Sequence, residues 1–201
     1  MPITTSSTFG AVAKWVFVRM VLGWWRQMTS RPVFYPNRDT LEKESPLGEK
    51  MRKSERMYAL WLTGTKAIVE IPSVNKVERL LLPDPNSKSL AFFQSAMKDK
   101  RDLGREIRES SRLARDKNIT VRWLKEFLGY SITIGNPRSD NTWVQIEIAF
   151  PALHGGNHPS FEFRKPKHSE TIDSVVKMFD TMCGDEYSRE PEDSELENST
   201  R

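Results

Sequence analysis

The sequence alternates apolar and polar residues over several short stretches, which is the pattern of β-strands with one buried face. The clearest period of two covers Thr142–Phe150, with Gln145 and Glu147 on one side and Ile146 and Ile148 on the other. Other strand-length stretches are found at 58–63, 80–82, 118–124, 130–134 and 161–163. A turn rich in Gly, Pro, Asn and Asp over 135–141 predicts that the strands on either side form a hairpin.

Helical stretches separate these predicted strands. We expect a short, irregular helix over 67–75, a long helical region over 89–116 that bends at Gly104, and a final helix over Ser169–Met182. In the final helix the apolar residues fall on one face, as in a helix packed on a sheet. The order of strands and helices predicts an α/β domain with a mixed sheet flanked by helices.

The strand at Leu80–Leu82 leads into a tight turn that predicts a binding site. Prolines on both sides of Asp84 force the turn, and Asn86 or Ser87 can cap the helix that follows. In open α/β sheets the ligand crevice lies off the carboxyl ends of the strands, where this turn would be. The residues expected to meet a ligand there are Thr63, Thr65, Lys66, Asp84, Asn86 and Ser87. The alternative is that the last three are turn and cap residues only.

Composition divides the chain into four parts: a Trp-rich helix in 1–29, a linker in 30–56, the α/β domain in 57–183 and an acidic disordered tail in 184–201. The apolar helix at Phe9–Met28 carries internal Lys and Arg residues and is too short for a comfortable membrane span. Three interpretations stay open for it: packing on protein, lying in a membrane interface, and a true membrane span.

The net charge of +4 hides an asymmetry, because the tail is acidic and the rest of the chain is more basic than the total. A basic body favours an anionic partner such as nucleic acid, a nucleotide, phosphate or an acidic membrane surface, although simple solubility explains it equally well. The single cysteine, Cys183, excludes an internal disulfide and fits a reducing compartment. We therefore expect a cytoplasmic protein, with the N-terminal helix as the segment that would hold it at the inner membrane face.

Five arginines with helical spacing would line one face of a helix: Arg101, Arg105, Arg108, Arg112 and Arg115. Arginine suits bidentate contact with phosphate, so the stripe is a candidate surface for nucleic acid, a lipid head group or an acidic protein. The alternative is a solvated face supported by neighbouring acidic residues.

The ordered set of elements resembles a single lobe of the phospholipase D-like fold, in particular the small bacterial branch found in sensory, effector and defence-type proteins. The resemblance covers about 57–182. It rests on the strand and turn at Leu80–Ser87, the Arg-rich helix, the stretch Ile119–Trp123, the hairpin at Ile132–Phe150 and the loop at Gly155–Phe163. It implies a phosphate-binding crevice at the rim of the sheet and a homodimer, since two lobes meet in active members.

Active members of that family carry the pattern His-x-Lys-x4-Asp. Here Ser131 and Thr133 stand in the places of the histidine and the lysine, and Arg138 stands in the place of the acid. A serine without an adjacent base is a poor nucleophile, and threonine brings no charge to phosphate. The resemblance therefore implies a degenerate site in which Ser131 and Thr133 contribute to ligand binding.

We consequently expect a non-catalytic module that senses or binds a phosphate-containing ligand, without a cofactor. One alternative is a phosphodiesterase or nuclease in which His154 or His158 replaces the usual nucleophile. Another is a protein that binds nucleic acid or an acidic partner through the arginine stripe. Metal binding is not expected, because the glycines and proline around His154 and His158 forbid the helix that would align them.

Overall fold

The computed structural model describes residues 31–97, 101–151 and 157–197. The chain divides into two units, 1–32 and 33–201, and the account below concerns the second. The predicted Trp-rich helix at 9–28 and the candidate His154 lie outside the described residues.

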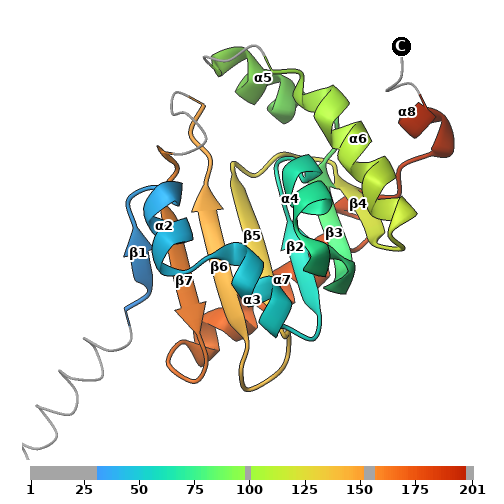
Figure 1. Ribbon diagram of the computed structural model, residues 1–201. Helices are drawn as coiled ribbons and strands as arrows, with labels where there is room; N and C mark the ends of the chain where they lie inside the picture. The colour runs from blue at the N-terminus through green and yellow to red at the C-terminus, as the bar shows by residue number, and fades with distance from the viewer. Residues whose placement is uncertain (1–30, 98–100, 152–156, 198–201) are drawn as a thin grey trace, which may run out of the picture. The chain divides into compact units, whose positions relative to one another are not determined.

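Within the described residues, the second unit is built on a mixed sheet of eight strands (Figure 1). In chain order the strands are β1 (Val33–Tyr35), β2 (Met57–Leu60), β3 (Val77–Pro83), β4 (Thr120–Leu124), β5 (Tyr130–Gly135), β6 (Trp143–Ile148), β7 (Ser160–Arg164) and β8 (Ser188–Arg189). Their spatial order is β1-β7-β6-β5-β2-β3-β4-β8. The pairs β2–β3 and β3–β4 are parallel and all other neighbours are antiparallel. The predicted α/β class with a mixed sheet is confirmed.

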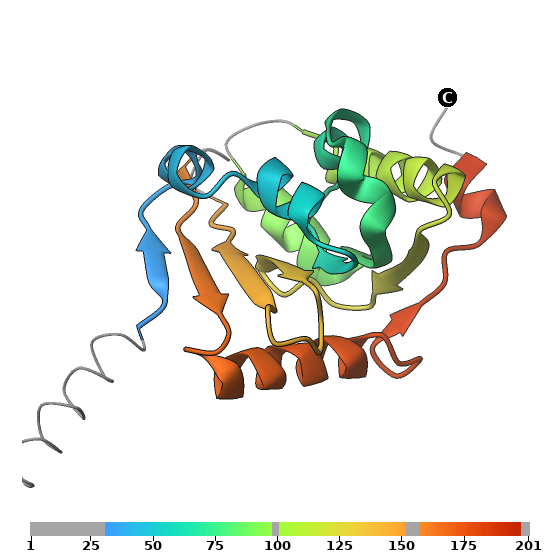
Figure 2. The ribbon, with the colours of Figure 1, turned by 60° about the horizontal axis from the view of Figure 1, so that its bottom comes forward.

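Helices cover both faces of this sheet. They are α2 (Arg38–Glu44), α3 (Leu47–Lys53), α4 (Thr65–Glu70), the 3-10 turn η1 (Pro72–Lys76), α5 (Lys88–Ala96), α6 (Leu103–Asp116), α7 (Ser169–Met182) and α8 (Asp193–Glu197). Figure 2 shows α7 along one face, with α2, α3, α4 and α6 on the opposite side. The arrangement is a three-layer α/β/α domain.

The two faces of the central strands bury two separate apolar clusters. Along β3, Leu80 and Leu82 join the cluster beneath α4 and α6, whereas Leu81 joins the cluster beneath α7. A strand buried on both faces needs apolar residues at successive positions. This explains the unbroken run of leucines before Pro83.

The predicted linker is corrected by the structure, because its described part forms β1, α2 and α3. Leu41 and Met51 from these helices are fully buried. The side chain of Asn37 accepts a hydrogen bond from the backbone N–H of Thr40 and caps α2, and Pro46 stands at the N-cap of α3. The Pro, Gly and charged residues therefore mark the ends of two short helices whose apolar positions pack on the sheet.

The predicted disordered tail is also corrected, since 184–197 contains β8 and α8. Ser188 is fully buried on the edge of the sheet, and Leu196 is 6% exposed in the cluster beneath α6. Acidic residues of the segment pair with arginines of the body, as in Arg115–Asp193 and Arg122–Asp185. The acidic composition reflects these contacts with a basic surface.

Two smaller outcomes concern the helices. The region 89–116 is two helices, with Asp102 capping the start of α6 through a hydrogen bond from the Arg105 amide, in place of one helix bent at Gly104. The predicted cap of α5 is Ser87, whose hydroxyl accepts from the Leu90 amide at 3.2 Å. Among the described residues, no helix is long and apolar enough to cross a membrane.

Candidate functional site: a polar pocket beside β5 and β6

One face of the antiparallel half of the sheet carries polar residues at every second position. In the strand register Ser131 lies opposite Glu147, and Glu147 lies opposite Ser160. One step along, Thr133 lies opposite Gln145 and Gln145 opposite Glu162. The intervening residues, such as Ile132 and Val144, join the cluster under α7. The antiparallel half therefore has an apolar face and a polar face, and most of the polar face is buried.

A cavity of about 260 Å³ opens on this polar face. Its polar lining comes from six parts of the chain: Arg38, Thr63, Lys66, Arg101, Ser131, Thr133, Gln145, Glu147 and His158. Trp61, Leu62 and Gly64 complete the wall beyond the end of β2. We call this cavity the β5–β6 pocket.

The chain path explains why the pocket forms at this edge. β2 ends at Leu60, where β5 begins beside it, with Leu60 paired to Ile132. The Trp61 indole N–H donates to the Thr133 hydroxyl at 3.0 Å, and the Leu62 amide donates to the Ser131 hydroxyl at 3.3 Å. The segment after β2 is thereby held against the first residues of β5. The pocket lies at the carboxyl end of a parallel strand, one strand away from the predicted position after β3.

His158 and Glu147 form a pair in the wall of the β5–β6 pocket. The His158 Nδ1 lies 3.4 Å from Glu147 Oε1, and the two side chains are 11% and 18% exposed. His158 Nε2 is buried and has no hydrogen-bond partner among the described residues. Buried polar atoms in native proteins nearly always have a partner, so this nitrogen is an exception in the wall of the pocket.

A buried ion pair supports the polar face behind the pocket. Glu162, with a fully buried side chain, is contacted by Lys50, Arg164 and the Ser45 hydroxyl, and Lys50 Nζ also lies 3.5 Å from Gln145 Oε1. Burial raises the pKa of Glu162, but hydrogen bonds from Lys50, Ser45 and Arg164 outweigh burial and leave that pKa below its usual value. Burial lowers the pKa of Lys50 despite this pairing. Glu162, Lys50, Arg164 and Ser45 therefore have hydrogen-bond partners among themselves, and we assign them a structural role behind the pocket.

The structure separates the sequence-predicted residues into two groups. Thr63, Lys66, Ser131 and Thr133 meet in the β5–β6 pocket. Thr65 does not join them, because its hydroxyl lies 2.7 Å from the Ser110 hydroxyl of α6.

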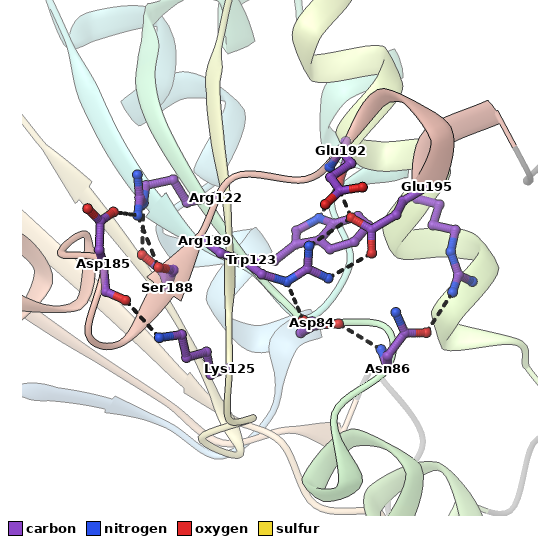
Figure 3. A network of polar contacts seen from close by, with 12 residues as sticks. Asp84, Asn86, Arg122, Trp123, Lys125, Asp185, Ser188, Arg189, Glu192 and Glu195 are labelled. Carbon is purple, nitrogen blue, oxygen red and sulfur yellow. Dashed lines mark hydrogen bonds and ion pairs between the residues drawn. The ribbon is translucent and has the colours of Figure 1, made fainter.

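Asp84, Asn86 and Ser87 lie in a different network, which closes the carboxyl ends of β3 and β4. Arg189 of β8 donates to Asp84 at 2.9 Å and makes a two-pronged contact with Glu195 at 2.7 and 2.8 Å (Figure 3). The guanidinium also lies over the Trp123 ring, 5.0 Å from its centre. Hydrogen bonding to Glu195 and Asp84 holds the pKa of Arg189 above its usual value. The predicted crevice after β3 is therefore filled by a side chain of the C-terminal segment.

Arg138, which stands in the place of the family's acid, is also remote from the pocket. It lies in the hairpin turn beyond the last residue of β5 with a φ of 66° and pairs with Asp180 of α7 at 2.6 Å. Because α7 covers the apolar face, Arg138 contributes to the opposite side of the sheet from Ser131 and Thr133.

Four of the five arginines lie on α6, whereas Arg101 precedes the N-cap residue Asp102 and is not part of the helix. Acidic and amide groups contact most of the stripe. The pairs are Arg101–Glu106, Arg108–Asn86, Arg112–Asp116 and Arg115–Asp193. The partners Asn86 and Asp193 come from outside α6, so helical spacing could not identify them. This arrangement favours the interpretation of the stripe as a paired, solvated face. Arg101 alone of the stripe also lines the β5–β6 pocket.

Comparison with known proteins assigns no family: no protein-family model matches the chain, and no curated protein matches it significantly. Within the described residues there is also no group of His, Cys, Asp and Glu side chains able to hold a metal ion. The chemistry of the site therefore has to be argued from the pocket itself.

Proposed function

We propose that this protein is a non-catalytic binding module for a small phosphate-containing ligand, which it holds in the β5–β6 pocket. The observation that carries the proposal is the convergence of Thr63, Lys66, Ser131 and Thr133 on one cavity that Arg38 and Arg101 also line. Cationic side chains and hydroxyl donors around one small cavity are the groups that bind a phosphate.

The hydrogen bonds of the Ser131 and Thr133 hydroxyls favour ligand binding over catalysis. Ser131 and Thr133 each accept a hydrogen bond, from the Leu62 amide and the Trp61 indole, so each keeps its proton to donate. An activated serine would instead give its proton to a neighbouring base. The phospholipase D-like hypothesis agrees with this arrangement, since Ser131 and Thr133 would stand where active members carry the reactive pair.

Isothermal titration of the full chain with inorganic phosphate tests the proposal. We expect saturable binding that weakens roughly 3- to 10-fold in the double variant Arg38→Gln/Lys66→Gln, because exposed charges each contribute up to about 1 kcal/mol. The matched control is Lys53→Gln, a surface lysine paired with Glu49 outside the pocket. Absence of binding, or equal weakening by both variants, would contradict the proposal.

A phosphodiesterase is the second candidate, favoured by one observation. The Nδ1 of His158 lies beside Glu147, and a carboxylate in this position orients a nucleophilic or proton-transferring histidine. The buried Nε2 would have to be uncovered before it could react. Hydrolysis of bis(p-nitrophenyl) phosphate by the wild-type chain, lost in His158→Ala, would support this candidate. A wild-type chain that does not release nitrophenol excludes it for this substrate.

The homodimer and the N-terminal attachment stay predictions. Native mass spectrometry of the full chain reports the number of subunits and any molecule retained through purification. Flotation of residues 9–28 fused to a soluble reporter distinguishes a membrane surface from a protein partner.

A further inference from the structure

We infer that the C-terminal segment 184–197 is exchangeable between molecules, and that the edge of β4 which it covers binds the same segment of a second copy of this chain. Two reciprocal exchanges then close a dimer. The inference is independent of the ligand in the β5–β6 pocket. It rests on how the edge of β4 recognises the segment and on how weakly the segment is held.

The edge of β4 holds the segment in the way that a sheet edge holds an added peptide strand. β8 pairs antiparallel with β4, and the Lys125 amide donates a hydrogen bond to the Tyr187 carbonyl at 3.0 Å. Without β8, β4 would be the outermost described strand on this side of the sheet. Backbone pairing of this kind gives affinity, and side-chain pockets select the sequence of the strand.

Two side chains of the segment have places made for them. Ser188 is fully buried, which leaves no room for a larger side chain. Arg189 donates to Asp84 at 2.9 Å, and its guanidinium lies over the Trp123 ring (Figure 3). Asp84 is 9% exposed, so a cation is needed at this position to satisfy a buried carboxylate. The edge of β4 therefore selects a small residue followed by an arginine.

Cations at the edge of β4 bind the main chain of the segment as well as its carboxylates. Lys125 Nζ donates to the carbonyl oxygens of Asp185 and Glu186 at 2.7 and 2.9 Å. Arg122 donates to the carbonyl oxygen of Ser188 at 3.0 Å. A sugar-phosphate backbone has no carbonyl groups, so these contacts favour a peptide over a nucleic acid as the occupant of this edge.

The ion pairs that hold the segment lie at the surface. In the pairs Arg115–Asp193 and Arg122–Asp185 the acidic side chains are 89% and 97% exposed. Exposed pairs contribute little to stability and are screened by salt. Leu196 is buried beneath α6, but the strand β8 is only two residues long. A segment with few buried apolar contacts opens more easily than the core of a domain.

A second copy brings a segment with every matching residue. The connection between α7 and β8 is 183–187, which spans roughly 17 Å when extended. A chain that lends its segment leaves its own edge of β4 open for the segment of the partner, so the exchange closes with two-fold symmetry. The segment of the same chain has the advantage of a high effective concentration. Exchange in the wild-type chain is therefore expected at high protein concentration.

Mixing two complementary variants of the full chain tests the inference. Arg189→Gln damages the segment and leaves the edge of β4 intact, whereas Arg115→Gln/Lys125→Gln damages the edge and leaves the segment intact. In the mixture, the intact segment of one chain meets the intact edge of the other. One variant is labelled with nitrogen-15 so that native mass spectrometry distinguishes the dimers. We expect about 5-fold more heterodimer than either homodimer, because two weakened surface contacts together contribute about this factor.

A second mixture is the control. Glu49→Gln and Lys53→Gln divide an exposed ion pair outside the segment in the same way and should give no excess of heterodimer over random pairing. If Arg189→Gln does not fold, Asp185→Asn/Asp193→Asn replaces it, since both carboxylates are largely exposed. The inference is overturned if the complementary mixture gives no excess of heterodimer or if the control gives an equal excess. Dimers that form equally in each variant alone use another surface and also overturn it.

Discussion

Ser131 of β5 and Glu147 of β6 are direct cross-strand partners, and both side chains line the same cavity. The pairing places a hydroxyl and a carboxylate on the face of the sheet that elsewhere buries apolar residues. Ser160 and Glu162 of β7 continue the polar face toward the edge. A polar surface that crosses three neighbouring strands is costly unless its groups are satisfied, and this one retains an unpartnered nitrogen at His158 among the described residues.

The Lys50–Glu162 pair is expected to stabilise the domain, because Glu162 is inaccessible to water and cannot be solvated if Lys50 is removed. Lys50→Met should lower the free energy of unfolding by about 3 kcal/mol, the lower end for breaking a buried ion pair, since Arg164 and Ser45 still contact Glu162. Urea denaturation measures the loss. The double variant Lys50→Met/Glu162→Gln should recover part of it, and a double variant less stable than Lys50→Met would contradict the assignment.

Glu162 should also make stability depend on pH in the acid range. Its pKa is lowered from the usual 4.5, so below that pH the unfolded chain binds a proton that the folded protein does not. The stabilisation is present above about pH 4.5 and is lost as the pH falls through the lowered pKa of the folded state. Between pH 3 and pH 6, the unfolding free energy of Glu162→Gln should fall less steeply with decreasing pH than that of the wild-type chain. The reason is that the unfolded variant takes up roughly one proton fewer. The control Glu49→Gln, at an exposed pair, should retain the wild-type slope.

Gly135 is required where β5 passes the ring of Trp143. A Cβ at this position would overlap the indole nitrogen and would lie 2.7 Å from the Ser54 hydroxyl that accepts the hydrogen bond of the indole. Gly135→Ala should therefore destabilise the fold by about 1–3 kcal/mol through overpacking. Gly48→Ala is the control, because a Cβ there meets nothing within 4 Å. In the helix α3 that alanine should stabilise by about 0.5–1 kcal/mol, and the two urea midpoints should move in opposite directions.

Arg189 should hold the C-terminal segment on the domain, since it joins β8 to Asp84 and to Glu195. Arg189→Gln leaves the buried Asp84 without its cation and should cost about 1–3 kcal/mol. Limited proteolysis should then cut within 184–197 earlier than in the wild-type chain. Arg112→Gln, which disrupts an exposed pair with Asp116, serves as the control and should leave the cleavage rate unchanged. Equal rates for wild type and Arg189→Gln would show that the segment is held by its other contacts.

The sequence was most informative about elements whose residues alternate or repeat without a break. The period of two at Thr142–Phe150 predicted β6, and the apolar face over Ser169–Met182 predicted α7 at the bounds observed. Composition misled where short elements carry the polar residues of caps and ion pairs. Residues 31–56 and 184–197 looked like a linker and a tail because Leu41, Met51 and Leu196 are isolated apolar residues whose burial depends on distant partners.

The candidate site was predicted in part. The carboxyl edge of the parallel strands was the expected place, and Thr63, Lys66, Ser131 and Thr133 do meet there. The sequence pattern predicts that Gln145 and Glu147 lie on one side of a strand. It does not give the strand register, which pairs them with Thr133 and Ser131. Arg38 was not expected at the site because it lies in the segment that composition predicts to be a linker. Asp84 was assigned to a ligand because the sequence could not show that Arg189, which follows it by 105 residues, occupies that turn.

The most direct test of the account is the location of phosphate on the protein. Amide chemical shifts of the isotope-labelled full chain, followed during titration with inorganic phosphate, should change most at Leu62, Gly64 and Ser131 around the β5–β6 pocket. Amides of Arg105 and Arg112 on α6 and of Arg189 on β8 should move little. Shifts concentrated on α6 or at Arg189, or no shift at the pocket under saturating phosphate, would contradict the assignment of this cavity as the binding site.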